Sequence, residues 1–70
     1  MERVPVSSSN LISVGYDEAS QTLEVEFMRG TIYHYLGVPK MLHESLIAAS
    51  SVGKFFNANI RDVFPFDQIG

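Results

Sequence analysis

The sequence predicts an α+β fold in which a three-stranded antiparallel β-meander is followed by two short α-helices packed on one face of the sheet. Apolar and polar residues alternate in short runs within residues 11–36, which is typical of half-buried strands. Apolar residues then recur at helical spacing in residues 39–49 and again in residues 52–60. A run of strands followed by a run of helices is typical of the α+β class.

The size and composition of the chain fit one small globular domain. It has 70 residues, of which 46% are hydrophobic and 19% are charged. We expect the polar residues 1–10 to form a flexible lead-in and residues 11–70 to form the single domain. The absence of cysteine excludes disulfides and thiol chemistry. No segment has the length and apolarity of a membrane span or a signal core, so we expect a cytoplasmic protein without membrane contact.

A polar loop from Asp17 to Thr22 joins the first two strands. An Asp at the start of such a loop can accept hydrogen bonds from backbone N–H groups within the turn. If Asp17 pairs with Thr22, six side chains share one face of the sheet as three cross-strand pairs. These pairs are Tyr16–Leu23, Val14–Val25 and Ile12–Phe27.

The loop around Gly30 sets the register of the third strand. A two-residue Arg-Gly loop would require a positive φ at Arg29, at a cost of about 1 kcal/mol or more. A three-residue loop with only Gly30 in the left-handed region avoids this strain, and we expect that loop. The resulting pairs are Val25–Tyr33 and Leu23–Tyr35, with both tyrosines on the apolar face. A slip of one residue in this pairing would turn every side chain of the third strand to the opposite face and place the tyrosines beside the glutamates.

The other face of the predicted sheet carries Glu24 opposite His34, together with four apolar residues. These four are Leu11, Met28, Ile32 and Leu36. Because four large apolar side chains are unfavourable in water, either the tail at residues 64–66 or another chain should cover them. This face therefore predicts a protein-interaction surface, with a homodimer as one form of it.

Two short helices follow the sheet. Pro39 suits the first helical position, and Leu42, Leu46 and Ala49 follow at i, i+4, i+7 spacing. Ser50 or Ser51 then offers an N-cap for the second helix. The apolar stripe of that helix is Val52, Phe56 and Ile60, and an extended segment around Pro65 closes the chain.

Two motifs resemble those of a known family. The first is Leu23-x-Val25-x-Phe27-x-x-Gly30-x-x-Tyr33-x-Tyr35-x-x-Val38-Pro39, and the second is Ser51-x-Gly53-Lys54-Phe55-Phe56-Asn57-x-x-Ile60-Arg61. Together they resemble the KTSC domain, which is named after the C-terminus of lysyl-tRNA synthetase and also occurs alone in short bacterial and phage proteins. The resemblance extends from about Ile12 to Phe66. It implies a β-meander with helices and a suggested role in RNA binding.

The aromatic motif residues have two interpretations. Tyr33 and Tyr35 could stack on RNA bases, as aromatic residues on a sheet do in several RNA-binding folds. The predicted register instead places both rings over Leu23 and Val25, under a helix, so we favour a core position. The other core residues expected from the motif are Phe56 and Ile60.

The second motif offers the best candidate binding surface. Ser51, Gly53 and Lys54 lie at a helix N-terminus that could bind an anion, or they form only an N-cap and a close helix contact. The pattern lacks the glycine and hydroxyl positions of a nucleotide-phosphate loop. Lys54, Asn57 and Arg61 follow i, i+3, i+7 spacing and could contact backbone phosphates.

We therefore consider two functions. The first is an RNA (tRNA)-binding accessory module that uses this local basic stripe, since a net charge of −3 argues against binding by bulk charge. The alternative is a protein-interaction or homodimerisation module on the outer sheet face. His34 and His43 lie on different elements without a carboxylate cluster, so the sequence predicts no metal site, no cofactor and no enzyme activity.

Overall fold

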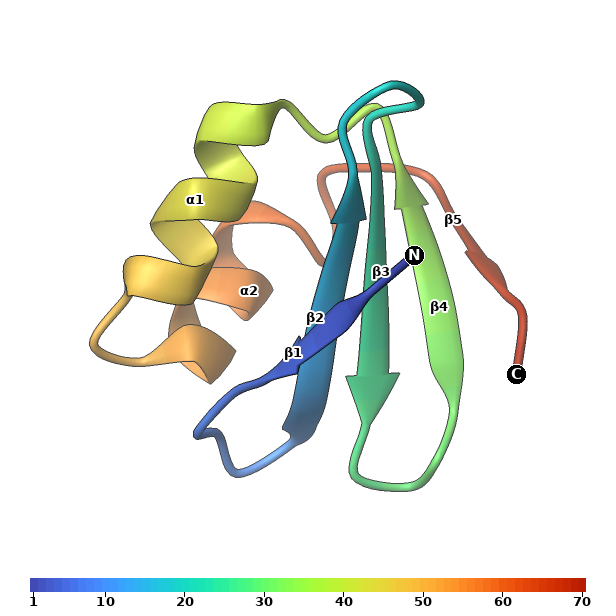
Figure 1. The fold of residues 1–70 in the computed structure, drawn as a ribbon. Coiled ribbons are helices and arrows are strands. Elements are labelled where there is room, and N and C mark those ends of the chain that lie inside the picture. Colours follow the sequence, from blue (N-terminus) through green and yellow to red (C-terminus); the bar gives the residue numbers. More distant parts are fainter.

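The computed structural model describes residues 1–70. Its elements follow one another along the chain in the order β1-β2-β3-β4-α1-α2-β5 (Figure 1). The elements are β1 (Arg3–Pro5), β2 (Leu11–Asp17), β3 (Thr22–Phe27), β4 (Ile32–Leu36), α1 (Lys40–Ala48), α2 (Val52–Asn59) and β5 (Phe66–Gln68). Both helices lie on one face of an antiparallel sheet, as Figure 1 shows. The predicted α+β class with a meander and two following helices is therefore confirmed.

The predicted number of strands is wrong, because the sheet has five strands in the order β1-β2-β3-β4-β5. β1 lies within the predicted lead-in and pairs with β2, where Arg3 stands opposite Gly15. β5 pairs with β4 at the other edge, where Phe66 stands opposite Tyr35. Each added strand has three residues, which is too short to show an alternating pattern. Both ends of the chain are consequently paired with the sheet.

The first hairpin follows the predicted register over most of its length. Asp17 pairs with Thr22, and the pairs Tyr16–Leu23 and Val14–Val25 form as expected. The predicted Ile12–Phe27 pair is wrong, because a bulge between Leu11 and Ser13 places Leu11 opposite Phe27. The bulge turns the fully buried Leu11 into the core and away from the outer face where it was expected.

The second hairpin has the predicted register. Gly30 has a φ of 89°, whereas Arg29 does not adopt a positive φ. The Phe27 N–H donates to the Thr31 carbonyl across the loop at 2.9 Å. Val25 therefore pairs with Tyr33 and Leu23 with Tyr35.

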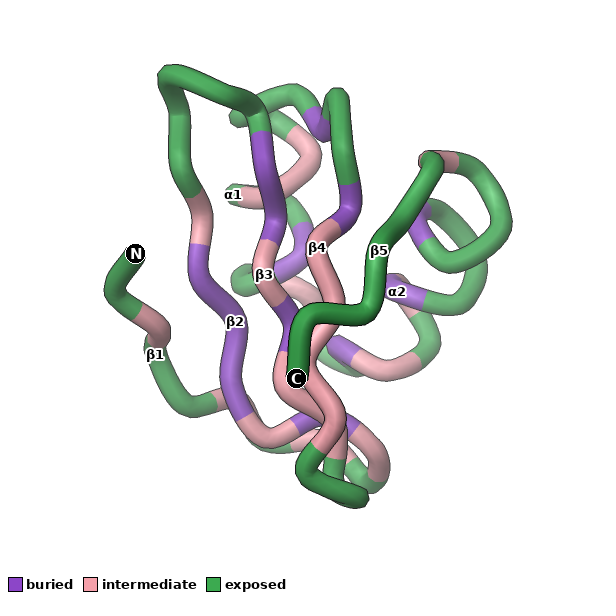
Figure 2. The backbone as a smooth tube through the Cα atoms, turned by 90° about the vertical axis from the view of Figure 1, so that its right-hand side faces the viewer, coloured by how far each residue is buried: buried purple, intermediate pink, exposed green.

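The two helices cover the sheet with one apolar stripe each. Pro39 occupies the N-cap position of α1 rather than its first turn, and the Ser51 hydroxyl caps α2. Ten buried residues form the core: Leu11, Val14, Leu23, Val25, Tyr35, Val38, Leu46, Val52, Phe56 and Ile60. Figure 2 shows the buried positions in the central strands and the helix faces, whereas β5 is exposed along its length. The core is thus thickest between β2–β4 and the helices, and it thins toward β5.

Candidate functional site

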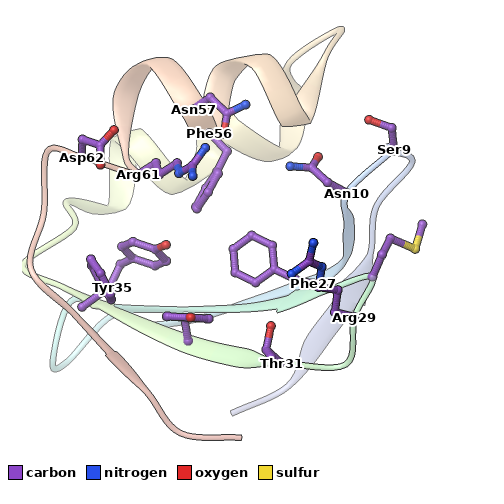
Figure 3. Close-up of a pocket in the computed structure, with 13 residues that line it drawn as sticks. Ser9, Asn10, Phe27, Arg29, Thr31, Tyr35, Phe56, Asn57, Arg61 and Asp62 are labelled. Carbon is purple, nitrogen blue, oxygen red and sulfur yellow. The ribbon is translucent and has the colours of Figure 1, made fainter.

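A groove of about 710 Å³ opens between α2 and the β3–β4–β5 side of the sheet (Figure 3). Its floor is aromatic, and its rim carries polar and charged side chains. The aromatic lining residues are Phe27, Tyr33, Tyr35, Phe56 and Phe66. The polar and remaining lining residues are Ser9, Asn10, Met28, Arg29, Thr31, Asn57, Arg61 and Asp62.

The aromatic floor is one connected cluster with a buried centre and an accessible edge. Phe56 descends from α2 and meets Tyr35 edge-to-face, with ring centroids 5.3 Å apart. Phe66 on β5 lies 5.6 Å from Tyr33 and 5.5 Å from Tyr35, again between ring centroids. Tyr35 and Phe56 are almost fully buried, Tyr33 is half-buried, and Phe66 is 53% exposed. The cluster therefore belongs to the core at one end and faces solvent at the other.

Two arginines reach the groove from different elements. Arg29 comes from the β3–β4 loop, and Arg61 comes from the turn that follows α2 (Figure 3). The Arg61 N–H donates to the Phe56 carbonyl at 3.0 Å, and this bond keeps the turn close to the helix end. None of the four ion pairs of the protein involves Arg29 or Arg61. Both guanidinium groups are therefore available to an anionic ligand.

The Tyr35 hydroxyl stays protonated at neutral pH. Burial is the main cause that raises its pKa above the ordinary value of 10.0, and Tyr33 and Asp62 add to the rise. Arg61 acts in the opposite direction and lowers the pKa. Tyr35 therefore contributes a neutral ring and a hydroxyl rather than a negative charge to the groove.

The structure separates the predicted basic stripe. Asn57 and Arg61 line the groove, whereas Lys54 is exposed and lies outside it. The division lies within α2, because Lys54 and Asn57 both belong to that helix, whereas Arg61 follows its end at Asn59 and still reaches the groove.

The N-terminal end of α2 makes intramolecular contacts. The Ser51 hydroxyl accepts a hydrogen bond from the Lys54 N–H at 3.4 Å. A Cβ atom at Gly53 would lie 2.9 Å from Asn10 Oδ1 and 3.0 Å from Ser8 Oγ. Gly53 therefore allows a close approach of the N-terminal segment, and not of the other helix as we expected.

Sequence reasoning missed Asn10, Arg29, Asp62 and Phe66 as groove residues. Arg29 could have been found, because the predicted loop places it at the end of the hairpin that carries Tyr33. Phe66 gave no such signal, since its position depends on the pairing of β5 with β4. Three of these residues lie outside the motifs and come from segments that only the tertiary fold brings together.

The four apolar residues expected on the outer face do not form one surface. Leu11 is in the core, and Met28 lines the groove. Ile32 is half-buried beside the C-terminal segment, where its N–H donates to the Gly70 carbonyl at 3.2 Å, and Leu36 is 38% exposed. The tail does not cover this face either, because Phe66 packs on the tyrosines of the groove.

A charged network occupies the centre of the outer face instead. His34 Nε2 lies 2.8 Å from Glu24 Oε1, as the predicted opposite placement of these residues requires. Arg3 from β1 lies 3.5 Å from Glu24 and 3.7 Å from Glu26. The Ser13 hydroxyl donates to Glu26 at 2.9 Å.

The second histidine has a different environment. His43 on α1 stacks on Tyr16 of β2, with ring centroids 4.6 Å apart and an interplanar angle of 8°. Burial lowers the pKa of His43, and Glu44 opposes this effect. The two histidines thus lie in separate places, and no group of three or more His, Asp or Glu side chains is arranged to hold a metal ion. Neither helix has the length and apolarity needed to cross a membrane.

Comparison with known proteins gives four related findings. The KTSC domain family matches residues 7–64. An uncharacterised protein from Stutzerimonas stutzeri is 47% identical over 57 residues, which are 81% of this chain and 80% of that protein. A lysine–tRNA ligase from Nostoc punctiforme is 41% identical over 54 residues, which are 77% of this chain but 10% of the ligase. The crystal structure of a KTSC domain protein from Yersinia pestis matches with a TM-score of 0.95 at 42% identity, covering 99% of this chain and 97% of that one.

Proposed function

Because this chain belongs to the KTSC domain family, we propose that it is a small RNA-binding module whose contact surface is the aromatic groove. Part of a lysine–tRNA ligase is similar to most of this chain, and such a ligase acts on tRNA. This similarity supports RNA as the ligand class.

The observation that carries the proposal is the pair of unpaired arginines beside accessible aromatic rings. Guanidinium groups bind phosphate oxygens through two parallel hydrogen bonds, and phosphate contacts supply most of the affinity for nucleic acids. Aromatic side chains bind unstacked RNA bases through their faces. Arg29, Arg61 and the exposed part of the Tyr33–Phe66 pair place both kinds of group in one groove.

The proposal differs from the helix-stripe hypothesis in the residues that it requires. Arg61 and Asn57 are common to both, whereas Arg29 belongs only to the groove and Lys54 only to the stripe. Alanine variants of Arg29 and Lys54 therefore separate the two surfaces. Each variant removes one positive charge, so a difference between them cannot arise from net charge.

The test is a titration of isotope-labelled protein with short RNA oligonucleotides at low salt, followed by amide chemical shifts and a binding isotherm. We expect shift changes at the residues of the groove, and we expect the Arg29→Ala/Arg61→Ala variant to bind more weakly. Each phosphate contact on a single strand contributes about −0.7 to the slope of log K against log salt. The double variant should therefore reduce the magnitude of that slope by about 1.4, which is two such contacts.

Lys40→Ala is the matched control, because Lys40 is exposed and pairs with Glu18 at 3.3 Å, at the start of α1. It removes one positive charge outside the groove. The RNA affinity and the salt slope of Lys40→Ala should equal those of the wild type. Unchanged spectra of the wild type at low salt would refute the proposed function, and equal losses in Lys40→Ala and Arg29→Ala would refute the groove as its surface.

A further inference from the structure

We infer that the groove selects unpaired nucleotides and stacks a base on the exposed edge of its aromatic cluster, at Phe66 and Tyr33. This inference rests on the proposed function, and it specifies which form of RNA the groove accepts. Three features support it: the exposure of Phe66, the size of the groove and the mixture of charges on its rim.

Phe66 is unusual among the aromatic residues of the cluster because about half of it is exposed. The ring lies on the groove side of the three-residue strand β5, where it contacts Tyr33 and Tyr35. Tyr33 is held from the same side, since its hydroxyl lies 3.3 Å from Gln68 Oε1 on β5. The two rings therefore form a fixed apolar edge that a planar group can cover, and stacking on a preformed aromatic edge needs little ordering of the protein.

The size of the groove favours a single nucleotide over a base pair. Its volume of about 710 Å³ lies within the range of pockets that hold small molecules, and such molecules are about the size of a nucleotide. Figure 3 shows Phe56 extending from α2 toward the sheet, with Phe27 and Tyr35 opposite it. A base within a duplex has both faces covered by its neighbours, so it can reach these rings only when it is unpaired.

The rim carries groups that suit the edge of a base as well as groups that suit a phosphate. Asn10 and Asn57 can each donate and accept hydrogen bonds, whereas the Asp62 carboxylate only accepts. A carboxylate repels phosphate but accepts hydrogen bonds from the N–H groups of bases. We therefore expect the Asp62 carboxylate to accept a hydrogen bond from a base, while the guanidinium groups of Arg29 and Arg61 bind phosphate oxygens.

The test compares a single-stranded RNA oligonucleotide with a duplex of the same length and sequence, in the same buffer. We expect the single strand to bind about tenfold more tightly or better, because a stacked base contributes about this factor to affinity. A second set of oligonucleotides carries one abasic position at each place in turn. One abasic position should lower the affinity severalfold, while the salt slope should stay the same because no phosphate is lost.

Phe66→Leu is the protein variant of choice, because leucine keeps an apolar side chain on β5 but lacks an aromatic face. It should reduce single-strand affinity severalfold at an unchanged salt slope, whereas Arg29→Ala should reduce the slope. The amide shifts of β4 and β5 verify that the strands remain paired in Phe66→Leu. The abasic series needs no protein variant, so it gives a result even if β5 detaches.

The outcomes separate the two proposals. If neither RNA form binds, the proposed function is wrong. If the duplex binds as tightly as the single strand, or if no abasic position weakens binding, the groove binds RNA through phosphates alone and the stacking inference is overturned. A single-strand preference together with a sensitive abasic position supports the inference.

Discussion

Phe56 connects the stability of the domain to its groove, and its replacement by alanine should be among the most damaging substitutions in the chain. Its side chain is 1% exposed and meets Phe27 and Tyr35 edge-to-face at 5.6 and 5.3 Å between centroids. Truncation of a buried Phe to Ala costs about 3–5 kcal/mol, because it removes transfer free energy and leaves a cavity. A domain of 70 residues has a total stability of about 4–10 kcal/mol.

Phe66→Ala provides the matched comparison, because it removes the same atoms from a residue that is 53% exposed. Full burial of a Phe side chain contributes about 1.5–3 kcal/mol, so half-burial corresponds to a loss of about 1 kcal/mol. The free energy of unfolding of the two variants should therefore differ by about 2 kcal/mol or more. The gradient of burial across the aromatic cluster predicts this difference.

Urea denaturation followed by circular dichroism measures both variants. With an m-value of about 1 kcal/mol/M for a domain of this size, Phe56→Ala should lower the midpoint by about 3 M and Phe66→Ala by about 1 M. If Phe56→Ala is unfolded in water, Phe56→Leu replaces it, with an expected loss of about 1–2 kcal/mol. A larger loss of unfolding free energy for Phe66→Ala than for the Phe56 variants would refute the assignment of Phe56 to the buried centre of the cluster and of Phe66 to its accessible edge.

Three further substitutions test other parts of the fold. Gly15→Ala should displace β1, because a Cβ at Gly15 would lie 2.8 Å from the Glu2 carbonyl oxygen. Hydrogen exchange of the β1 amides should then be faster than in the wild type, and amides that stay protected would contradict this prediction. Gly30→Ala should cost about 1 kcal/mol of unfolding free energy from its φ of 89° alone, since nothing lies within 4 Å of the new Cβ, and an unchanged midpoint would argue against that strain. The lowered pKa of His43 means that the unfolded chain binds more protons, so stability should fall as pH decreases through 6.5. His43→Phe keeps a ring over Tyr16 and should remove this part of the pH dependence, so identical pH profiles of the two proteins would refute it.

The sequence predicted the centre of the sheet well because turn residues restrict the register. The loop that begins at Asp17 and the single positive φ at Gly30 leave few ways to pair the three strands. The bulge was missed because Leu11 and Ile12 are both apolar. Alternation alone cannot decide which of the two faces the core.

The edges of the sheet could not be predicted from local pattern. β1 and β5 have three residues each, and their pairing depends on neighbours that are distant in the sequence. The candidate site has the same limitation. Asn57 and Arg61 were identified from the second motif, whereas Phe66 enters the groove only because β5 pairs with β4.

The net charge of −3 gave the main argument against nucleic-acid binding, and the distribution of charges weakens that argument. Glu24 and Glu26 lie on the outer face, where Arg3 and His34 pair with them. The groove lies on the opposite, helix-covered face of the sheet, where Arg61 has no ion-pair partner. Arg3 lies 3.5 Å from Glu24 and 3.7 Å from Glu26, so it offsets part of the acidic charge of that face at short range. The net charge of the chain therefore does not describe the surroundings of the groove, and an acidic chain can still present a local site for an anionic ligand.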